Sequence, residues 1–118
     1  MRRARISAGG APLMLDLNVT TRTIDRLKGW IGRKSIAERD ALLIQPCNSV
    51  HTWFMHVPID VVFLDRQHRV VGVRDNVGPR RLCMHWRAAS ALELQAGRSA
   101  ALGLAPGVQL DIDDGDSR

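Results

Sequence analysis

The feature that most constrains the fold is the apolar run VVFL at residues 61–64, which carries no polar side chain on either face. Side chains along a strand point alternately to opposite faces, so a run that is apolar throughout predicts a strand covered on both sides. Turn-forming residues RQH follow Asp65 and lead into the second strand-like segment RVVGVRDNV. The two segments together predict a buried β-hairpin.

Shorter strand-like segments recur along the rest of the chain, separated by glycine, proline and polar residues. We expect strands in LMLDLNVT (13–20), ALLIQPC (41–47), 50–57, ASALEL (89–94) and VQLDI (108–112). A short helix is predicted by the apolar spacing of Ile24, Leu27 and Ile31, and a helical turn by AGRSAAL, closed by Gly103. GPRRLCMHW (78–86) is expected to be irregular. This pattern predicts a mainly β (α+β) fold, a compact antiparallel β-barrel or sandwich with one or two short helices.

The length of 118 residues suits a single domain, expected to span 1–118, with a flexible basic arm at about 1–11 and an acidic tail at about 113–118. Cys47 and Cys83 are too few for a disulfide scaffold, so we expect reduced thiols. The first residues lack the apolar core of a signal peptide, and no run approaches the roughly 20 apolar residues that span a bilayer. We therefore expect a cytoplasmic protein without a membrane partner.

The net charge of +5 raises the question of a polyanionic partner. Nucleic-acid binding needs a contiguous basic patch, whereas the arginines and lysines here are scattered along the chain. Trp30, Trp53 and Trp86 could stack on bases, but tryptophans in apolar stretches more often belong to the core. A small anionic ligand or a protein partner is therefore favoured over nucleic acid.

The segment HTWFMHVPID (51–60) concentrates aromatic and titratable side chains within a predicted strand. Strand alternation places its odd-numbered side chains on one face and its even-numbered ones on the other, that is, His51, Trp53 and Met55 against Thr52, Phe54 and His56. Either face could line a pocket.

A metal site would draw on Cys47, His51, Met55 and His56. On a straight strand residues 51 and 56 point to opposite faces, and residues 47 and 51 lie roughly 13 Å apart, too far to share an ion. The chain also lacks CxxC and HExxH motifs. We predict no metal site and no cofactor.

Other catalytic arrangements rest on weaker patterns. Cys47 could act as a nucleophile with His51 or His85, although a packed thiol is the commoner role. GWIGRKS lacks the spacing of a phosphate loop, and its glycines follow the helical residues, where the helix dipole repels anions. For two-carboxylate chemistry the only pairings on offer are Asp60 with Glu93 or Asp65.

Three blocks of the chain together resemble the domain-of-unknown-function 192 family of bacteria and archaea: KGWIGR (28–33), PCNSVHTWFMHVPIDVVFLD (46–65) and ALELQAGRSAALGLAPG (91–107). They occur in the family's order and cover nearly the whole chain. The resemblance implies a compact, mainly β single domain and brings no established catalytic mechanism.

Asp60 stands among apolar residues, and a buried carboxylate needs a partner, for which Arg33, Arg80 and Arg81 are the natural choices. We predict a binding or accessory module with its site near the HTWFM and PID segments, formed by Arg33, His51, Thr52, Trp53, Met55, Asp60 and Arg80. Whether the protein is an enzyme stays open. The alternatives are a small hydrolase with His51 as general base, because imidazole transfers protons near neutral pH, and a nucleic-acid-binding module.

Overall fold

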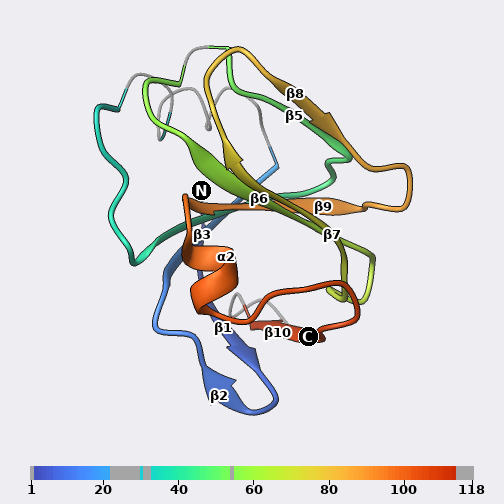
Figure 1. Cartoon of the computed structure of the whole chain (residues 1–118). Coiled ribbons are helices and arrows are strands. Elements are labelled where there is room, and N and C mark those ends of the chain that lie inside the picture. The colour runs from blue at the N-terminus through green and yellow to red at the C-terminus, as the bar shows by residue number, and fades with distance from the viewer. Residues whose placement is uncertain (1, 22–29, 31–32, 54, 114–118) are drawn as a thin grey trace.

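The computed structural model describes residues 2–21, 30, 33–53 and 55–113. These residues are mostly β strand, in a sheet that curls on itself with a short helix against it (Figure 1), which confirms the predicted fold class. The helix is α2 (Arg98–Ala101), and the strands are β1 (Arg2–Ala8), β2 (Ala11–Pro12), β3 (Asp16–Thr20), β4 (Asp40–Ile44), β5 (Ser49–His51), β6 (Ile59–Leu64), β7 (Val70–Val77), β8 (Leu82–Met84), β9 (Ser90–Gln95) and β10 (Leu110–Asp113).

The main sheet has the strand order β10-β1-β3-β4-β9-β6-β7, and β2 pairs with β1 off this path. Its strand pairs are antiparallel except for β3 and β4, which run parallel from Asp16 beside Asp40 to Thr20 beside Ile44. Parallel neighbours need a crossover of a dozen or more residues, and residues 21–39 provide it here.

The strand predicted from VVFL is β6, and every residue of Ile59–Leu64 is buried. Val62 and Leu64 pack into a first apolar cluster with side chains of β1, β3, β9 and β10. Val61 and Phe63 point the other way, into a second cluster that includes Val50 and Met55. The expected strand with two covered faces is confirmed, and so is its hairpin with β7.

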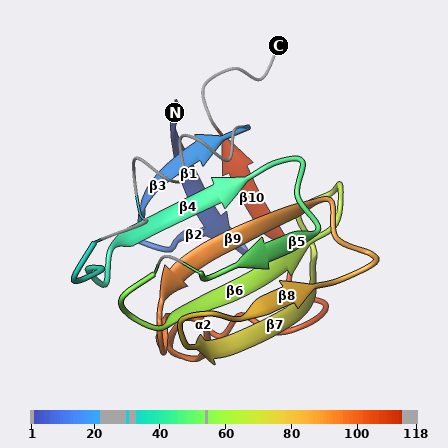
Figure 2. The same ribbon diagram turned by 90° about the horizontal axis from the view of Figure 1, so that it is seen from above.

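A separate two-stranded sheet, β5 with β8, covers the second cluster. Figure 2 shows this pair lying across β9, β6 and β7, and in Figure 1 it forms a layer on one side of the main sheet. Cys83 lies beside Val50 in the pair, and both contact the second cluster. The expectation that residues 78–86 are irregular is wrong for Leu82–Met84, because pairing with a strand more than thirty residues away is invisible in the local sequence.

The first residues also differ from expectation. Residues 2–8, expected to belong to a flexible basic arm, form β1, which pairs with β3 and β10. The exposed Arg3 and Arg5 alternate with Ala4 and Ile6, which pack on the first cluster. A charged and apolar alternation of this kind is a half-buried strand pattern. At the other end Asp113 belongs to β10, and residues 114–118 lie outside the described residues.

The expected helical turn in AGRSAAL is α2, and it ends as predicted, with Gly103 in the left-handed region at φ 70°. The predicted helix with Ile24, Leu27 and Ile31 lies outside the described residues. No helix among the described residues is long and apolar enough to cross a bilayer.

The contact between β7 and the covering layer can be tested at Gly72. A Cβ on this residue would lie 2.7 Å from Cδ2 of His85. The His85 ring is held 5.9 Å from the ring of Phe63, between centroids, and its Nδ1 accepts a 3.1 Å hydrogen bond from the Arg87 N–H. Gly72→Ala should therefore lower the free energy of unfolding by about 1–3 kcal/mol, measured by urea denaturation.

Gly78→Ala is the matched control, because a Cβ there meets nothing within 4 Å. It should change stability by no more than about 0.5 kcal/mol. In a His85→Ala background the added methyl at position 72 should become harmless. An equal loss with and without His85 would rule out the ring contact as the cause.

Candidate functional site

The chain leaves the strand conformation directly after His51. A turn follows, in which the Met55 N–H donates to the Thr52 carbonyl at 3.1 Å. Thr52 and Met55 are both buried, whereas Trp53 between them is 53% exposed. The predicted alternation of faces over residues 51–56 is therefore wrong, since it assumed a straight strand.

Thr52 fixes this turn to the loop that precedes β8. Its hydroxyl donates to the Gly78 carbonyl at 2.6 Å and accepts from the Arg81 N–H at 2.9 Å. The backbone adds two bonds, from the Thr52 N–H to the Arg81 carbonyl and from the Arg80 N–H to the Thr52 carbonyl. Thr52 is fully buried, and its hydroxyl links the two loops through these hydrogen bonds.

The outer face of the β5–β8 sheet carries exposed apolar side chains. Leu82, paired with His51, is 62% exposed, and Met84, paired with Ser49, is 61% exposed. Trp53 stands edge-on to the His51 ring at 6.3 Å between ring centroids. The Nδ1 atom of His51 is buried and has no hydrogen-bond partner within the described part of the chain. We call His51, Trp53, Leu82 and Met84 the outer face.

Two further features border the outer face. Trp86, two residues beyond Met84, is 87% exposed, and the Arg87 guanidinium lies 6.0 Å from the centre of its ring. On the side of β8 that faces β7, a groove with a cavity volume of about 700 Å³ is lined by residues 73–79 and 81–84. We call it the β7–β8 groove.

Asp60 belongs to the opposite side of the main sheet. Its carboxylate accepts hydrogen bonds from the Asn76 N–H (2.9 Å) on one oxygen. The other oxygen accepts from the Gly97 N–H (3.1 Å), the Ser99 N–H (2.9 Å) and the Ser99 hydroxyl (2.6 Å). These groups take the place of the arginines expected as its partners. The carboxylate thus joins β6, the end of β7 and the start of α2.

The pKa of Asp60 follows from these contacts. Burial raises the pKa of this carboxyl, but the hydrogen bond from the Ser99 hydroxyl and those from the three N–H groups lower it, and the result lies below 3.8. The charged form is therefore the stable one in the folded protein.

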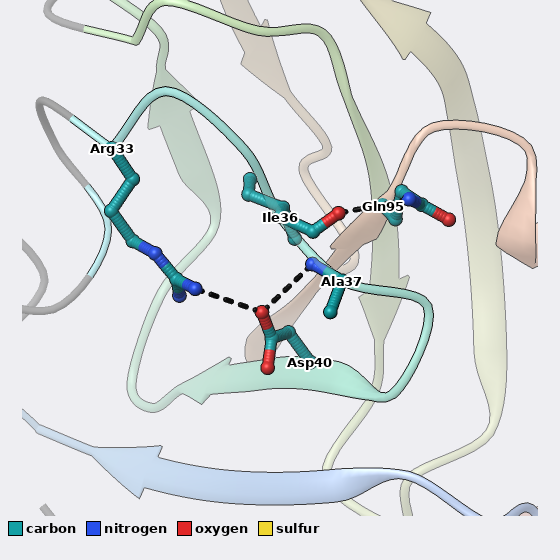
Figure 3. Close-up of polar contacts among 5 residues, drawn as sticks. All are labelled: Arg33, Ile36, Ala37, Asp40 and Gln95. Carbon is teal, nitrogen blue, oxygen red and sulfur yellow. Dashed lines mark hydrogen bonds and ion pairs between the residues drawn. The ribbon is translucent and has the colours of Figure 1, made fainter.

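Of the two arginines predicted for the site, Arg33 has another role and Arg80 lies beside Thr52. Arg33 forms an ion pair with Asp40 at 3.0 Å, and the Ala37 N–H donates to the same carboxylate oxygen at 2.9 Å. Figure 3 shows these contacts together with the Gln95 side chain, which donates to the Ile36 carbonyl at 2.8 Å. The segment before β4 is fixed in this way. Arg80 is exposed, with its backbone at φ 58°, in the loop that Thr52 holds.

The remaining sequence candidates include a carboxylate pair that does not converge. Glu93 lies beside Val61 and Asp60 beside Leu94 in the β6–β9 ladder, so the two carboxylates point to opposite faces. The Cys47 thiol donates to the Ser49 carbonyl at 3.0 Å. In the described ranges no three His, Cys, Asp or Glu side chains are placed to hold a metal ion together.

The structure thus groups His51, Thr52, Trp53 and Arg80, while Met55 lies in the core beneath them, Asp60 faces the other cluster and Arg33 pairs with Asp40. Sequence reasoning missed Leu82 and Met84. The signal was present in RLCMH, where apolar residues two apart flank Cys83, but it gains meaning only once β8 is known to cover the second cluster.

Comparison with known proteins adds the following. The family model DUF192, described as an uncharacterised ACR, matches residues 4–112. A protein of unknown function from Novosphingobium aromaticivorans has a similar structure, with TM-score 0.77 and 16% identity over 92% of this chain and 83% of the other. A putative transcription regulator from Sinorhizobium meliloti gives TM-score 0.73 and 22% identity, over 93% and 92%. No curated protein matches. At these identities the two structures show a shared fold.

A variant of Asp60 tests whether its carboxylate stabilises the contact between β6, β7 and α2. In Asp60→Asn the amide cannot accept all four bonds and brings donors against donors, so the free energy of unfolding should fall by about 2–4 kcal/mol at pH 7, measured by urea denaturation. Asp75→Asn, an exposed carboxylate in the same hairpin, should change little.

The pH dependence provides a second readout of the same residue. The folded pKa of Asp60 is lowered from 3.8, so its stabilisation is present above about pH 4 and is lost as the pH falls through the folded pKa. The wild type should therefore lose stability faster than Asp60→Asn as the pH falls below about 4, measured by urea denaturation at a series of pH values. Parallel curves would contradict this account.

Proposed function

Because the chain belongs to the DUF192 family, whose description assigns no activity, we propose a function from the geometry of its surface: it is a binding module that recognises a partner protein through the outer face of the β5–β8 sheet. The observation that carries this is the placing of exposed apolar side chains. Of the large hydrophobic residues exposed in the described part of the chain, all but Met14 lie in or beside this layer: Trp53, Leu82, Met84 and Trp86.

The residue types support a protein partner. Contiguous exposed apolar side chains mark interaction surfaces, and tryptophan, methionine and arginine are enriched in the centres of protein interfaces. Covering apolar surface contributes about 25 cal/mol per Å², so a partner that buried these side chains would gain free energy from them. Leu82 and Met84 have no ring on which a base could stack, which favours a protein over nucleic acid.

Charge around the outer face points to an acidic partner. Arg74 and Arg81 line the β7–β8 groove, where Asp75 is the single acidic lining residue, and Arg80 and Arg87 are exposed nearby. A second copy of the chain would place these arginines against one another, and like charges across an interface are unfavourable. An acidic segment of another protein would pair with them.

Two alternatives receive less support. The name of the Sinorhizobium neighbour, a putative transcription regulator, suggests nucleic-acid binding, for which this surface offers arginines and two tryptophans. A hydrolase with His51 as general base needs a carboxylate beside it, and Asp60 faces the other side of the main sheet.

For the compartment we propose the cytoplasm, since neither cysteine is in a disulfide.

The test begins with a displayed library of random twelve-residue peptides, selected on the immobilised full chain. Enriched peptides should bind the protein in solution, measured by fluorescence polarisation. Replacing an exposed methionine of the outer face, Met84→Ser, together with Leu82→Ser, should raise the Kd at least tenfold, because interface anchors typically contribute more than about 1 kcal/mol.

Met14→Ser is the matched control, because Met14 is 64% exposed and lies outside the β5–β8 layer. It should leave the Kd within about twofold, a change of roughly 0.4 kcal/mol. A library that yields no peptide above background, or an equal loss in the Met14 variant, would reject the outer face as the binding surface.

A further inference from the structure

Strand β7 is an edge of the main sheet. Within the described residues it pairs with β6 on one side and ends the strand order, apart from contacts of Val70 with residues 107 and 108. An edge strand presents backbone N–H and C=O groups that can pair with another chain. The stretch from residue 73 to 77 is the part of this edge that lines the β7–β8 groove.

Strand β8 supplies the opposite wall of the groove. In the described chain it pairs with β5 alone, so its other edge is also open to pairing. Figure 2 shows β8 lying between β5 and β7 in projection, and residues of β7 and β8 line the same groove. The groove therefore lies between the edges of β7 and β8, and on the β7 side the Asn76 N–H is already bonded to Asp60.

Contacts already described fix the chain at both ends of the groove. At one end the His85 ring lies against Gly72, and at the other the loop 78–81 is held by the Thr52 hydroxyl. Asn76 has a φ of 51° and its N–H donates to Asp60, so the regularly extended stretch of this edge is 73–75. At 3.3 Å per residue it gives a length of roughly 10 Å, which suits about three residues of extended chain. The walls are thus set before any partner arrives, which lowers the ordering cost of binding.

Resting on the proposed function, we propose that the partner's segment enters the β7–β8 groove as an extended strand and pairs with the open backbone edge there. Alternate side chains of a strand point to opposite sides. Apolar side chains of the segment cover Leu82 and Met84, and its carboxylates pair with Arg74 and Arg81. The recognised class is an acidic, alternately apolar peptide.

The charges on β7 are consistent with this selectivity. Charged residues such as Arg74 and Asp75 on an edge strand discourage indiscriminate sheet pairing. Strand β8 forms the second wall of the groove, so we expect one strand, and not a wider sheet, to enter it. Main-chain hydrogen bonds then give affinity, while the side chains choose the sequence.

The experiment uses the tightest peptide from the library selection and a set of copies, each N-methylated at one backbone amide. Methylation keeps every side chain and removes a ladder donor. We expect methylation at alternate positions to raise the Kd at least tenfold and at the intervening positions to have little effect, because a strand's donors point alternately to two sides. Hydrogen exchange of residues 73–77 and 82–84 should slow on binding.

A charge reversal tests the chemistry of the segment. Arg74→Glu should weaken binding at least tenfold, and a peptide in which lysine replaces only one of its acidic residues, the one that faces position 74, should restore it. Arg66→Glu, an exposed arginine in the β6–β7 turn, is the control and should leave the Kd within about twofold.

The outcomes separate the two proposals. Peptides that need Leu82 and Met84 but tolerate N-methylation at every position would overturn strand pairing and leave the outer face as a binding surface. The library could yield no peptide while a fluorescein-labelled, twelve-nucleotide oligothymidylate binds with an affinity that falls steeply with salt. In that case the surface binds nucleic acid, and both proposals fail.

Discussion

Burial of β6 on both faces is the constraint on which the rest of the structure depends. Val62 and Leu64 must be buried on one face of the sheet, and Val61 and Phe63 on the other. A single sheet with one solvent-exposed face therefore cannot bury all four side chains. The curled main sheet closes over the first cluster. The second cluster is left to the short pair β5–β8 and to the segment that Arg33, Asp40 and Gln95 hold in place.

A two-stranded layer of three residues a strand cannot hide both of its own faces. Val50 and Cys83 point inward and complete the core, and alternation then sends Leu82 and Met84 to the outside. Nothing in the packing requires these outward positions to be apolar, since polar side chains would solvate the layer equally well. Their apolar character is the feature on which the proposed binding surface rests.

The two ends of the segment HTWFMHVPID have different structural roles. Its first residues belong to the covering layer, where Thr52 fastens two loops and Trp53 is exposed. Asp60, only a few residues on, lies in the deepest strand and faces the first cluster. There its carboxylate satisfies four donors from β7 and the start of α2, which makes a charge in the core a cross-link between elements. Residues that are close in the chain therefore serve opposite faces of one sheet.

Much of the fold followed from local pattern: the doubly covered β6, its hairpin with β7, strands β3, β4, β9 and β10, and the helical turn closed by Gly103. Local pattern also located the polar residues of the 51–60 segment and required that a buried Asp60 be partnered. It did not reveal that β1 and β8 are strands, that His51 ends β5, or that Asp60 turns away from His51. Strand pairing, and the face to which a side chain points, depend on backbone partners far along the chain. Such long-range hydrogen bonds cannot be recognised in the local sequence pattern. The sequence by itself determined which residues must be buried and which strands must be covered on both faces. Only the tertiary structure decided which side chains of the covering layer are exposed, because the packing of the layers distinguishes the inner face of β8 from its outer face.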